Sequence, residues 1–149
     1  MKIFLANEHD TLALGASLSK AETKNCLIFL HGQLGAGKTT LVRGFLRESG
    51  YSGTVKSPTY TLVEEYELKS HRIFHFDLYR LSDPEELEWV GVRDYFDADA
   101  TCFIEWPERG ASMLPAADLD IQLEVFDDGR IAIISGLSKQ GQDVIDKMQ

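Results

Sequence analysis

The chain has 149 residues, 44% of them apolar, which is enough to bury the core of one domain spanning residues 1–149. Its 24 acidic and 15 basic residues give a net charge of -9, which would repel a nucleic-acid backbone over much of the surface. We therefore do not expect the chain to bind nucleic acid alone, although the net charge leaves a local basic patch open. Any nucleic acid is expected to be reached indirectly, through a more basic partner.

Neither the cysteines nor the apolar runs indicate an extracellular or a membrane protein. Cys26 and Cys102 each lie inside an apolar run, and their separation fits neither a disulfide framework nor a zinc site. The longest apolar run, residues 26–30, is far shorter than the roughly 20 residues that a membrane helix needs. We expect buried, reduced thiols in a cytoplasmic protein without membrane contact.

The first third of the chain predicts strand, helix, strand, loop and helix in turn. A short strand is expected at residues 1–6 and a helix at residues 10–21. The apolar run at residues 26–30 has no polar alternation, which is typical of a strand buried on both faces of a parallel sheet. After a glycine-rich turn, apolar residues recur at helical spacing up to a stop signal at Gly50.

The next segment predicts a hairpin. Two strand-like runs, residues 59–68 and 72–79, are separated by Lys69-Ser70-His71. Because side chains alternate along a strand, the second run has two distinct faces. One face carries Phe74, Phe76 and Leu78, and the other carries His75 and Asp77.

The remainder alternates short helices with strands. Asp127-Asp128-Gly129 lies between residues 121–126 and 130–135, which predicts an antiparallel hairpin with its glycine in a left-handed conformation. In chain order, the other expected elements are a helix near Pro84 and Glu85-Glu86, a helix at residues 92–96, a buried strand at residues 101–104, and a loosely held helix from Ser138.

A phosphate-binding loop stands between the buried strand and the following helix. Residues 32–39 read Gly-Gln-Leu-Gly-Ala-Gly-Lys-Thr and fit G-x-x-x-x-G-K-[ST] at every fixed position. Glycines let backbone N–H groups turn toward phosphates, and the helix adds its positive N-terminal end. We expect Lys38 to reach the terminal phosphates, Thr39 to ligate Mg²⁺ and Thr40 to contact the first phosphate.

These elements together predict an α/β fold of the P-loop NTPase type. We expect a three-layer sandwich in which a mostly parallel central sheet carries antiparallel hairpins and has helices on both faces. Guanine recognition usually needs a late Asn-Lys-x-Asp motif, and the nearest segment, residues 7–10, has no lysine and precedes the loop. ATP is therefore the favoured nucleotide.

Two strands end in a carboxylate that is suited to complete a phosphate site. P-loop enzymes hold Mg²⁺ or position the attacking water with such an acid. Asp77 and Glu105 both qualify, and spacing alone does not rank them. His75 is either a packing residue or a group that supports the site. Trp106 is either an ordinary aromatic residue or part of the rim of the site. One further segment has two possible roles. It reads Ser-Pro-Thr-Tyr-Thr at residues 57–61 and forms either an ordinary turn or a segment that senses the terminal phosphate.

Four blocks in this order and spacing resemble one family. They are residues 31–40 (HGQLGAGKTT), 57–62 (SPTYTL), 75–80 (HFDLYR) and 104–107 (IEWP). Together they resemble TsaE, formerly YjeE, over about residues 11–115. The resemblance implies an ATPase in the pathway that places threonylcarbamoyl on the adenosine beside the anticodon of tRNAs reading codons that begin with A. It also implies that TsaD and TsaB are partners and that tRNA is met only through their complex.

The resemblance also implies roles for single residues. Lys38, Asp77 and Glu105 would serve catalysis, and Thr39 with Glu105 would hold Mg²⁺. The residues that would contact ATP are Thr11, Gly35, Ala36, Gly37, Lys38, Thr39, Thr40, Trp106 and Arg130.

Two other functions compatible with a phosphate loop stay open. The first is a nucleotide-gated interaction module in which hydrolysis is slow or incidental. The second is a small-molecule kinase, although the seven arginines scattered along the chain suggest no arginine-bearing lid.

Overall fold

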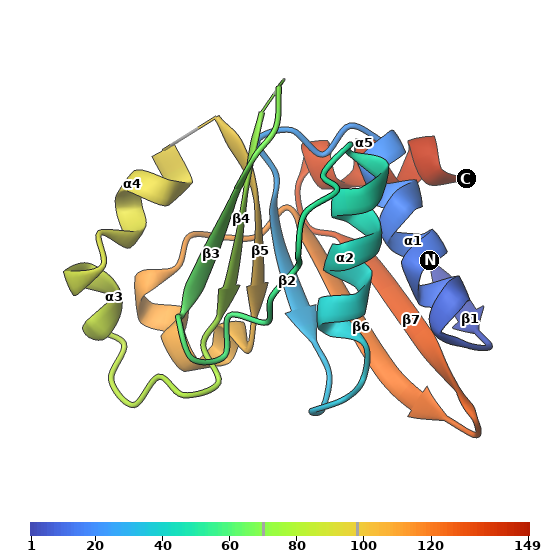
Figure 1. The fold of residues 1–149 in the computed structure, drawn as a ribbon, viewed down its shortest axis with the longest axis horizontal. Helices are drawn as coiled ribbons and strands as arrows, with labels where there is room; N and C mark the ends of the chain where they lie inside the picture. Colours follow the sequence, from blue (N-terminus) through green and yellow to red (C-terminus); the bar gives the residue numbers. More distant parts are fainter. Residues whose placement is uncertain (70, 98) are drawn as a thin grey trace.

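A single mixed sheet organises the molecule. The computed structural model describes residues 1–69, 71–97 and 99–149, and its seven strands are ordered β1-β7-β6-β2-β5-β4-β3 (Figure 1). The strands are β1 (Lys2–Leu5), β2 (Leu27–His31), β3 (Val63–Glu67), β4 (Arg72–Asp77), β5 (Ala100–Glu105), β6 (Leu119–Phe126) and β7 (Gly129–Gly136).

The four central strands, β6, β2, β5 and β4, run parallel. Antiparallel strands flank them, with β3 on β4 at one edge, and β7 on β6 followed by β1 on β7 at the other. The predicted parallel centre and both predicted hairpins are thus confirmed. Parallel strands end at the same edge of a sheet, so the last residues of β2, β4 and β5 lie close together: His31, Asp77 and Glu105.

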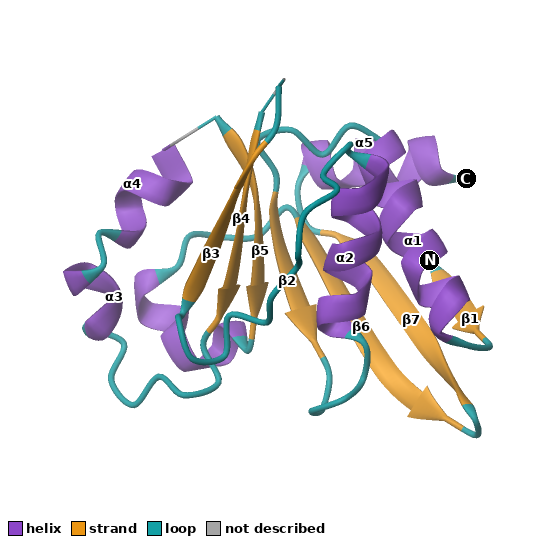
Figure 2. Ribbon diagram, viewed as in Figure 1, coloured by secondary structure: helices purple, strands orange, loops and turns teal. Residues whose placement is uncertain are grey.

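Helices cover both faces of the sheet, as predicted (Figure 2). They are α1 (Glu8–Lys20), α2 (Lys38–Glu48), α3 (Glu86–Trp89), α4 (Val92–Asp97), the 3₁₀ helix η1 (Pro107–Met113) and α5 (Lys139–Met148). One core joins α1, α2 and α5 to side chains such as Ile73, while a second joins α3 and α4 to side chains such as Phe74. Because Ile73 and Phe74 are consecutive on β4, these cores lie on opposite faces.

Close packing of α1 on α2 fixes the helix that follows the phosphate loop. The two helices lie side by side in Figure 1, and each presents a glycine to the other. A Cβ on Gly15 would meet the backbone of Leu41 and Phe45, and a Cβ on Gly44 would meet the backbone of Leu12. The helices approach this closely only because these positions have no side chain.

The strand predicted at residues 59–68 is shorter than expected. Pro58 O accepts a hydrogen bond of 2.8 Å from Leu62 N, and Leu62 has a φ of 73°, so residues 58–62 form a turn. Strand β3 begins only at Val63, and β4 ends at Asp77. Ser70, in the predicted turn between these strands, lies outside the described residues.

The prediction of a left-handed Gly129 was wrong. Asp127 takes the left-handed conformation, with a φ of 53°, while Gly129 belongs to β7 and pairs with Phe126. A Cβ on Gly129 would collide with the carbonyl oxygen of Leu5 on β1. The glycine is therefore required by close approach of a neighbouring strand, and aspartate tolerates the turn conformation.

The two terminal helices also differ from expectation. Helix α1 begins at Glu8 because the side chain of Asn7 accepts a hydrogen bond of 2.9 Å from Asp10 N and caps the first turn. Helix α5 is not loosely held, since Val144 and Ile145 are buried in the core.

Cys26 and Cys102 are buried free thiols, as predicted. None of the helices formed by the described residues is both long enough and apolar enough to cross a membrane.

Candidate functional site

The phosphate loop connects the end of β2 to the start of α2, as predicted (Figure 2). Gly35 and Gly37 have φ values of 79° and 109°, a region that side chains disfavour. Gly37 is the N-cap of α2, and Leu41 N donates to its carbonyl oxygen at 2.9 Å. The sequence needs glycines here because the chain must turn sharply from a buried strand into a helix whose free N–H groups face the loop.

Lys38 is held inside this loop. The residue is 5% exposed, and its ammonium donates hydrogen bonds to the carbonyl oxygens of Gly32 and, at 3.2 Å, Gln33. Its Nζ also lies 4.6 Å from the centroid of the Trp106 ring. Burial lowers the pKa of Lys38, and the nearby carboxylates, Glu105 first, oppose that shift. The loop thus keeps one desolvated cation at the N-terminus of α2.

Glu105, the last residue of β5, contacts both helix α2 and strand β4. Its Oε2 accepts a hydrogen bond of 3.2 Å from Thr39 Oγ1 and lies 2.6 Å from Nε2 of His75. Glu105 and His75 are 3% and 0% exposed. A buried carboxylate at a strand end is therefore tied to the first turn of α2, where a metal-bound phosphate is expected.

Asp77 lies opposite Glu105 in the register of β4 and β5. Its Oδ2 accepts a hydrogen bond of 2.8 Å from Thr59 Oγ1, and its Oδ1 accepts one of 2.9 Å from Tyr79 N. Thr59 is bonded in turn to Ser57, with 2.8 Å between their hydroxyl oxygens. The hydroxyl-rich segment at residues 57–61 is thus anchored to a carboxylate of the site.

One cleft collects most of the predicted site residues. Its volume is about 220 Å³, and it lies where the N-terminus of α2 meets the ends of β4 and β5. It is lined by Leu34, Gly35, Ala36, Gly37, Lys38, Thr39, Thr40, Ser57, Thr59, Asp77, Glu105 and Trp106. All the predicted catalytic and metal-binding residues are therefore together.

Thr11 and Arg130 line a different hollow, on the other side of the loop. This hollow has a volume of about 270 Å³ and shares Gly35–Gly37 and Thr40 with the cleft. The Arg130 guanidinium donates to the carbonyl oxygens of Ala36 and Gly35 at 3.0 and 3.1 Å. Asn7 and Asp128 also line it and were not predicted, although their places at a helix cap and a hairpin turn were local signals.

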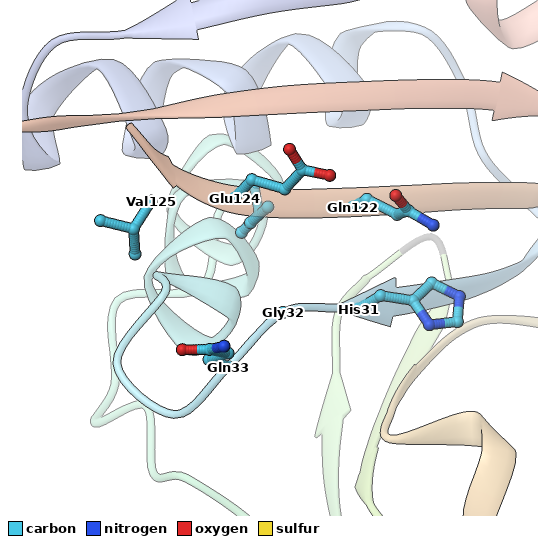
Figure 3. Close-up of a pocket in the computed structure, with 7 residues that line it drawn as sticks. His31, Gly32, Gln33, Gln122, Glu124 and Val125 are labelled. Atoms are coloured by element: carbon cyan, nitrogen blue, oxygen red, sulfur yellow. The ribbon is translucent and has the colours of Figure 1, made fainter. Parts of the chain in front are cut away.

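A third hollow, of about 370 Å³, lies between the start of the loop and β6 (Figure 3). His31, Gln33, Gln122 and Glu124 are among its lining residues. The His31 ring lies 2.6 Å from Asp120 Oδ1, measured from Nε2. The sequence did not predict this hollow, because it depends on the parallel pairing of β2 with β6.

Comparison with known proteins places this geometry in context. A sequence model described as "Threonylcarbamoyl adenosine biosynthesis protein TsaE" matches residues 5–132. A tRNA threonylcarbamoyladenosine biosynthesis protein TsaE from Haemophilus influenzae is 52% identical over 122 residues, covering 82% of this chain and 77% of that protein. The protein of the same name from Bacillus subtilis is 33% identical to this chain over 118 residues, covering 79% of this chain and 73% of that protein.

The fold has a solved counterpart. A crystal structure of Bacillus subtilis YdiB superposes with a TM-score of 0.84 at 27% identity, covering 99% of this chain and 93% of that one. The predicted P-loop NTPase-like α/β class is confirmed by this match and by the sheet topology.

Proposed function

Because the chain belongs to the TsaE family of tRNA threonylcarbamoyladenosine biosynthesis proteins, we propose that it is a Mg²⁺-dependent ATPase that supports this modification. In this proposal it acts as an accessory subunit of a TsaB–TsaD complex. The single observation that carries the ATPase part is the cleft at the start of α2. There the Lys38 ammonium, the Thr39 hydroxyl and the carboxylates of Asp77 and Glu105 line one space.

The donor set of the cleft fits a magnesium nucleotide. Mg²⁺ prefers oxygen ligands and keeps several waters, so a hydroxyl and one or two carboxylates are the protein ligands it needs beside phosphate oxygens. Thr39 and Glu105 offer such oxygens 3.2 Å apart. When bound there, the ion would neutralise charge that develops on the phosphate oxygens. Thr39 and Glu105 would hold it, as the resemblance to TsaE implied.

Lys38 and Asp77 have separate tasks in this proposal. Burial partly removes the Lys38 ammonium from water, so its attraction for a phosphate oxygen is stronger than at the surface. Asp77 has each oxygen engaged by one donor, Thr59 or the Tyr79 backbone. A carboxylate oxygen can accept a second hydrogen bond, so Asp77 can orient a water molecule for attack.

The surface charge supports a partner that handles the tRNA. A net charge of -9 disfavours direct binding of the chain to a phosphate backbone. Basic surfaces of TsaB or TsaD would make those contacts, and the present chain would meet tRNA only through the complex. Its contribution is then nucleotide turnover, not the transfer of the threonylcarbamoyl group.

One observation favours a second function, a nucleotide-gated interaction module. Thr59 connects Asp77 in the cleft to the segment at residues 57–61, where the adjacent Tyr60 is 82% exposed. Arg80 stacks on the Tyr60 ring at 4.3 Å. A change at Asp77 on nucleotide exchange would therefore reach a surface that a partner can contact, with or without hydrolysis.

Hydrolysis of ATP by the purified chain tests the proposal. It is measured with Mg²⁺ or EDTA, alone and with the TsaB–TsaD pair, next to a Lys38→Ala variant. We expect turnover that needs Mg²⁺, rises with the partners and is lost in the variant. Tight nucleotide binding without turnover in any mixture would instead support the gating module, and absence of binding would refute both.

A further inference from the structure

His75 is a buried polar residue to which the proposed chemistry gives no role. It lies on β4 two residues before Asp77, and the strand alternation turns both side chains toward α2. The residue is 0% exposed, and its parallel partner on β5 is Phe103, which packs edge-on against Phe45 of α2 at 4.9 Å. A fully buried histidine needs a specific polar contact to offset the cost of its burial.

Glu105 supplies that contact. The two side chains are diagonal neighbours on adjacent parallel strands, close enough for Nε2 of His75 to lie 2.6 Å from Glu105 Oε2. The other ring nitrogen, Nδ1, has no hydrogen-bond partner among the described residues. Among the residues that the structure describes, Glu105 is therefore the hydrogen-bond partner of the ring, and Nε2–H is the donor because an ionised carboxylate can only accept.

This contact restrains the orientation of the Glu105 carboxylate. Oε2 already accepts from Thr39 Oγ1 as well as from His75. Within the part of the chain that the structure describes, no hydrogen bond reaches Oε1, and Glu105 lines the cleft. With Oε2 held on one side by His75 of the strand and on the other by Thr39 of the helix, the carboxylate cannot rotate freely, and it keeps its place at the wall of the cleft.

We propose that His75 is a positioning residue that orients Glu105 toward Mg²⁺ in the nucleotide-bound protein. The inference rests on the proposed function and extends it by one residue behind the metal ligand. Partners of this kind commonly fix the orientation of a ligand, and losing one costs about 10- to 100-fold in metal affinity. The competing explanation is that His75 only fills space between β4 and α2.

Three substitutions separate positioning from packing. His75→Gln keeps an N–H donor at the place of Nε2, His75→Asn moves the donor back to the place of Nδ1, and His75→Ala removes it. Thr101→Val is the matched control, because Thr101 is a fully buried residue of β5 whose hydroxyl bonds the Thr23 carbonyl at 2.9 Å, away from the cleft. Each variant is assayed for thermal unfolding and for binding of a fluorescent ADP analogue.

The informative quantity is the ratio of nucleotide Kd in EDTA to nucleotide Kd in Mg²⁺. We expect this ratio to fall about 10-fold in His75→Ala and His75→Asn, with the Kd in EDTA nearly unchanged. His75→Gln should recover most of it, and Thr101→Val should lower the melting temperature without changing the ratio.

Two results would overturn the inference and leave the proposed function standing. One is a ratio equal to that of the wild type in all three His75 variants. The other is an equal loss of affinity with and without Mg²⁺, which would mark a packing defect. If the wild-type chain bound no nucleotide at all, the proposed function would fail first, and the role of His75 with it.

Discussion

Lys38→Met should strongly weaken nucleotide binding without destabilising the nucleotide-free protein. Burial lowers the pKa of Lys38 despite the opposing effect of Glu105 and Asp77. A lowered pKa means that folding disfavours the charged form, so removal of the charge removes an unfavourable contribution to stability. Methionine keeps a long apolar side chain in the space that the lysine stem occupies. The melting temperature without nucleotide should therefore equal or exceed that of the wild type.

The effect on binding has the opposite sign. A hydrogen bond to a charged group contributes about 1.5–3 kcal/mol, which corresponds to about a 10- to 150-fold change in Kd. Titration with a fluorescent ADP analogue measures this change, and thermal unfolding with and without Mg²⁺ and ADP measures stability. Lys20→Met is the matched control, because the Lys20 side chain is 70% exposed and forms a surface ion pair with Glu48 at 3.5 Å.

Two outcomes would refute the reasoning about Lys38. Wild-type affinity in Lys38→Met would show that the ammonium does not meet phosphate. A clearly lower melting temperature without nucleotide would show that the hydrogen bonds of the ammonium to the loop carbonyls and its attraction to the carboxylates outweigh its desolvation. The control, Lys20→Met, should match the wild type in both assays.

Three further predictions concern hydrolysis, packing and pH. Asp77→Asn should lower the kcat of ATP hydrolysis about 100-fold, while the nucleotide affinity measured by titration stays nearly unchanged. Equal losses of both would contradict a role in orienting water. Gly44→Ala should lower the free energy of unfolding in denaturant by about 1–3 kcal/mol, because its Cβ would meet the α1 backbone; an unchanged value would disprove that close contact. Burial raises the pKa of Cys26 and Cys102 from 9.0 to about 12, so the unfolded chain loses these protons first. Stability should then fall between pH 9 and 12 by about 1.4 kcal/mol per pH unit per thiol, and a double Cys→Ala variant that kept the whole slope would refute this origin.

Local patterns predicted the parts of the site that are local in the chain. The loop at residues 32–39 and its place between a strand and a helix follow from glycine positions and apolar runs. That Asp77 and Glu105 lie together also follows, because both end parallel strands at one edge of the sheet. The anchoring of Asp77 by Thr59 did not follow, since a turn at residues 58–62 replaces the start of the strand that was predicted there.

Contacts between distant segments were beyond prediction from patterns. Thr11 and Arg130 come from α1 and β7, and only the packed sheet shows that both lie across the loop from Asp77. The need for a glycine at residue 129 also depends on a contact with a segment distant in the sequence. Turn chemistry predicted a left-handed glycine, but the closeness of Leu5 on a neighbouring strand explains this glycine, and Asp127 makes the turn. Crowding by a strand that is distant in the sequence leaves no signature in the adjacent residues.

The register of β4 against β5 is the feature on which the site depends most. It sets Asp77 opposite Glu105 and brings His75 within 2.6 Å of Glu105 Oε2. A shift of β4 by one residue would turn Phe74 and Phe76 toward the cleft and bury the two polar side chains against α3 and α4. Hydrophobic burial of those phenylalanines opposes such a shift, since they pack in the second core. The apolar face of β4 thus stabilises the geometry of the polar one, so the alternating pattern at residues 72–79 specifies both.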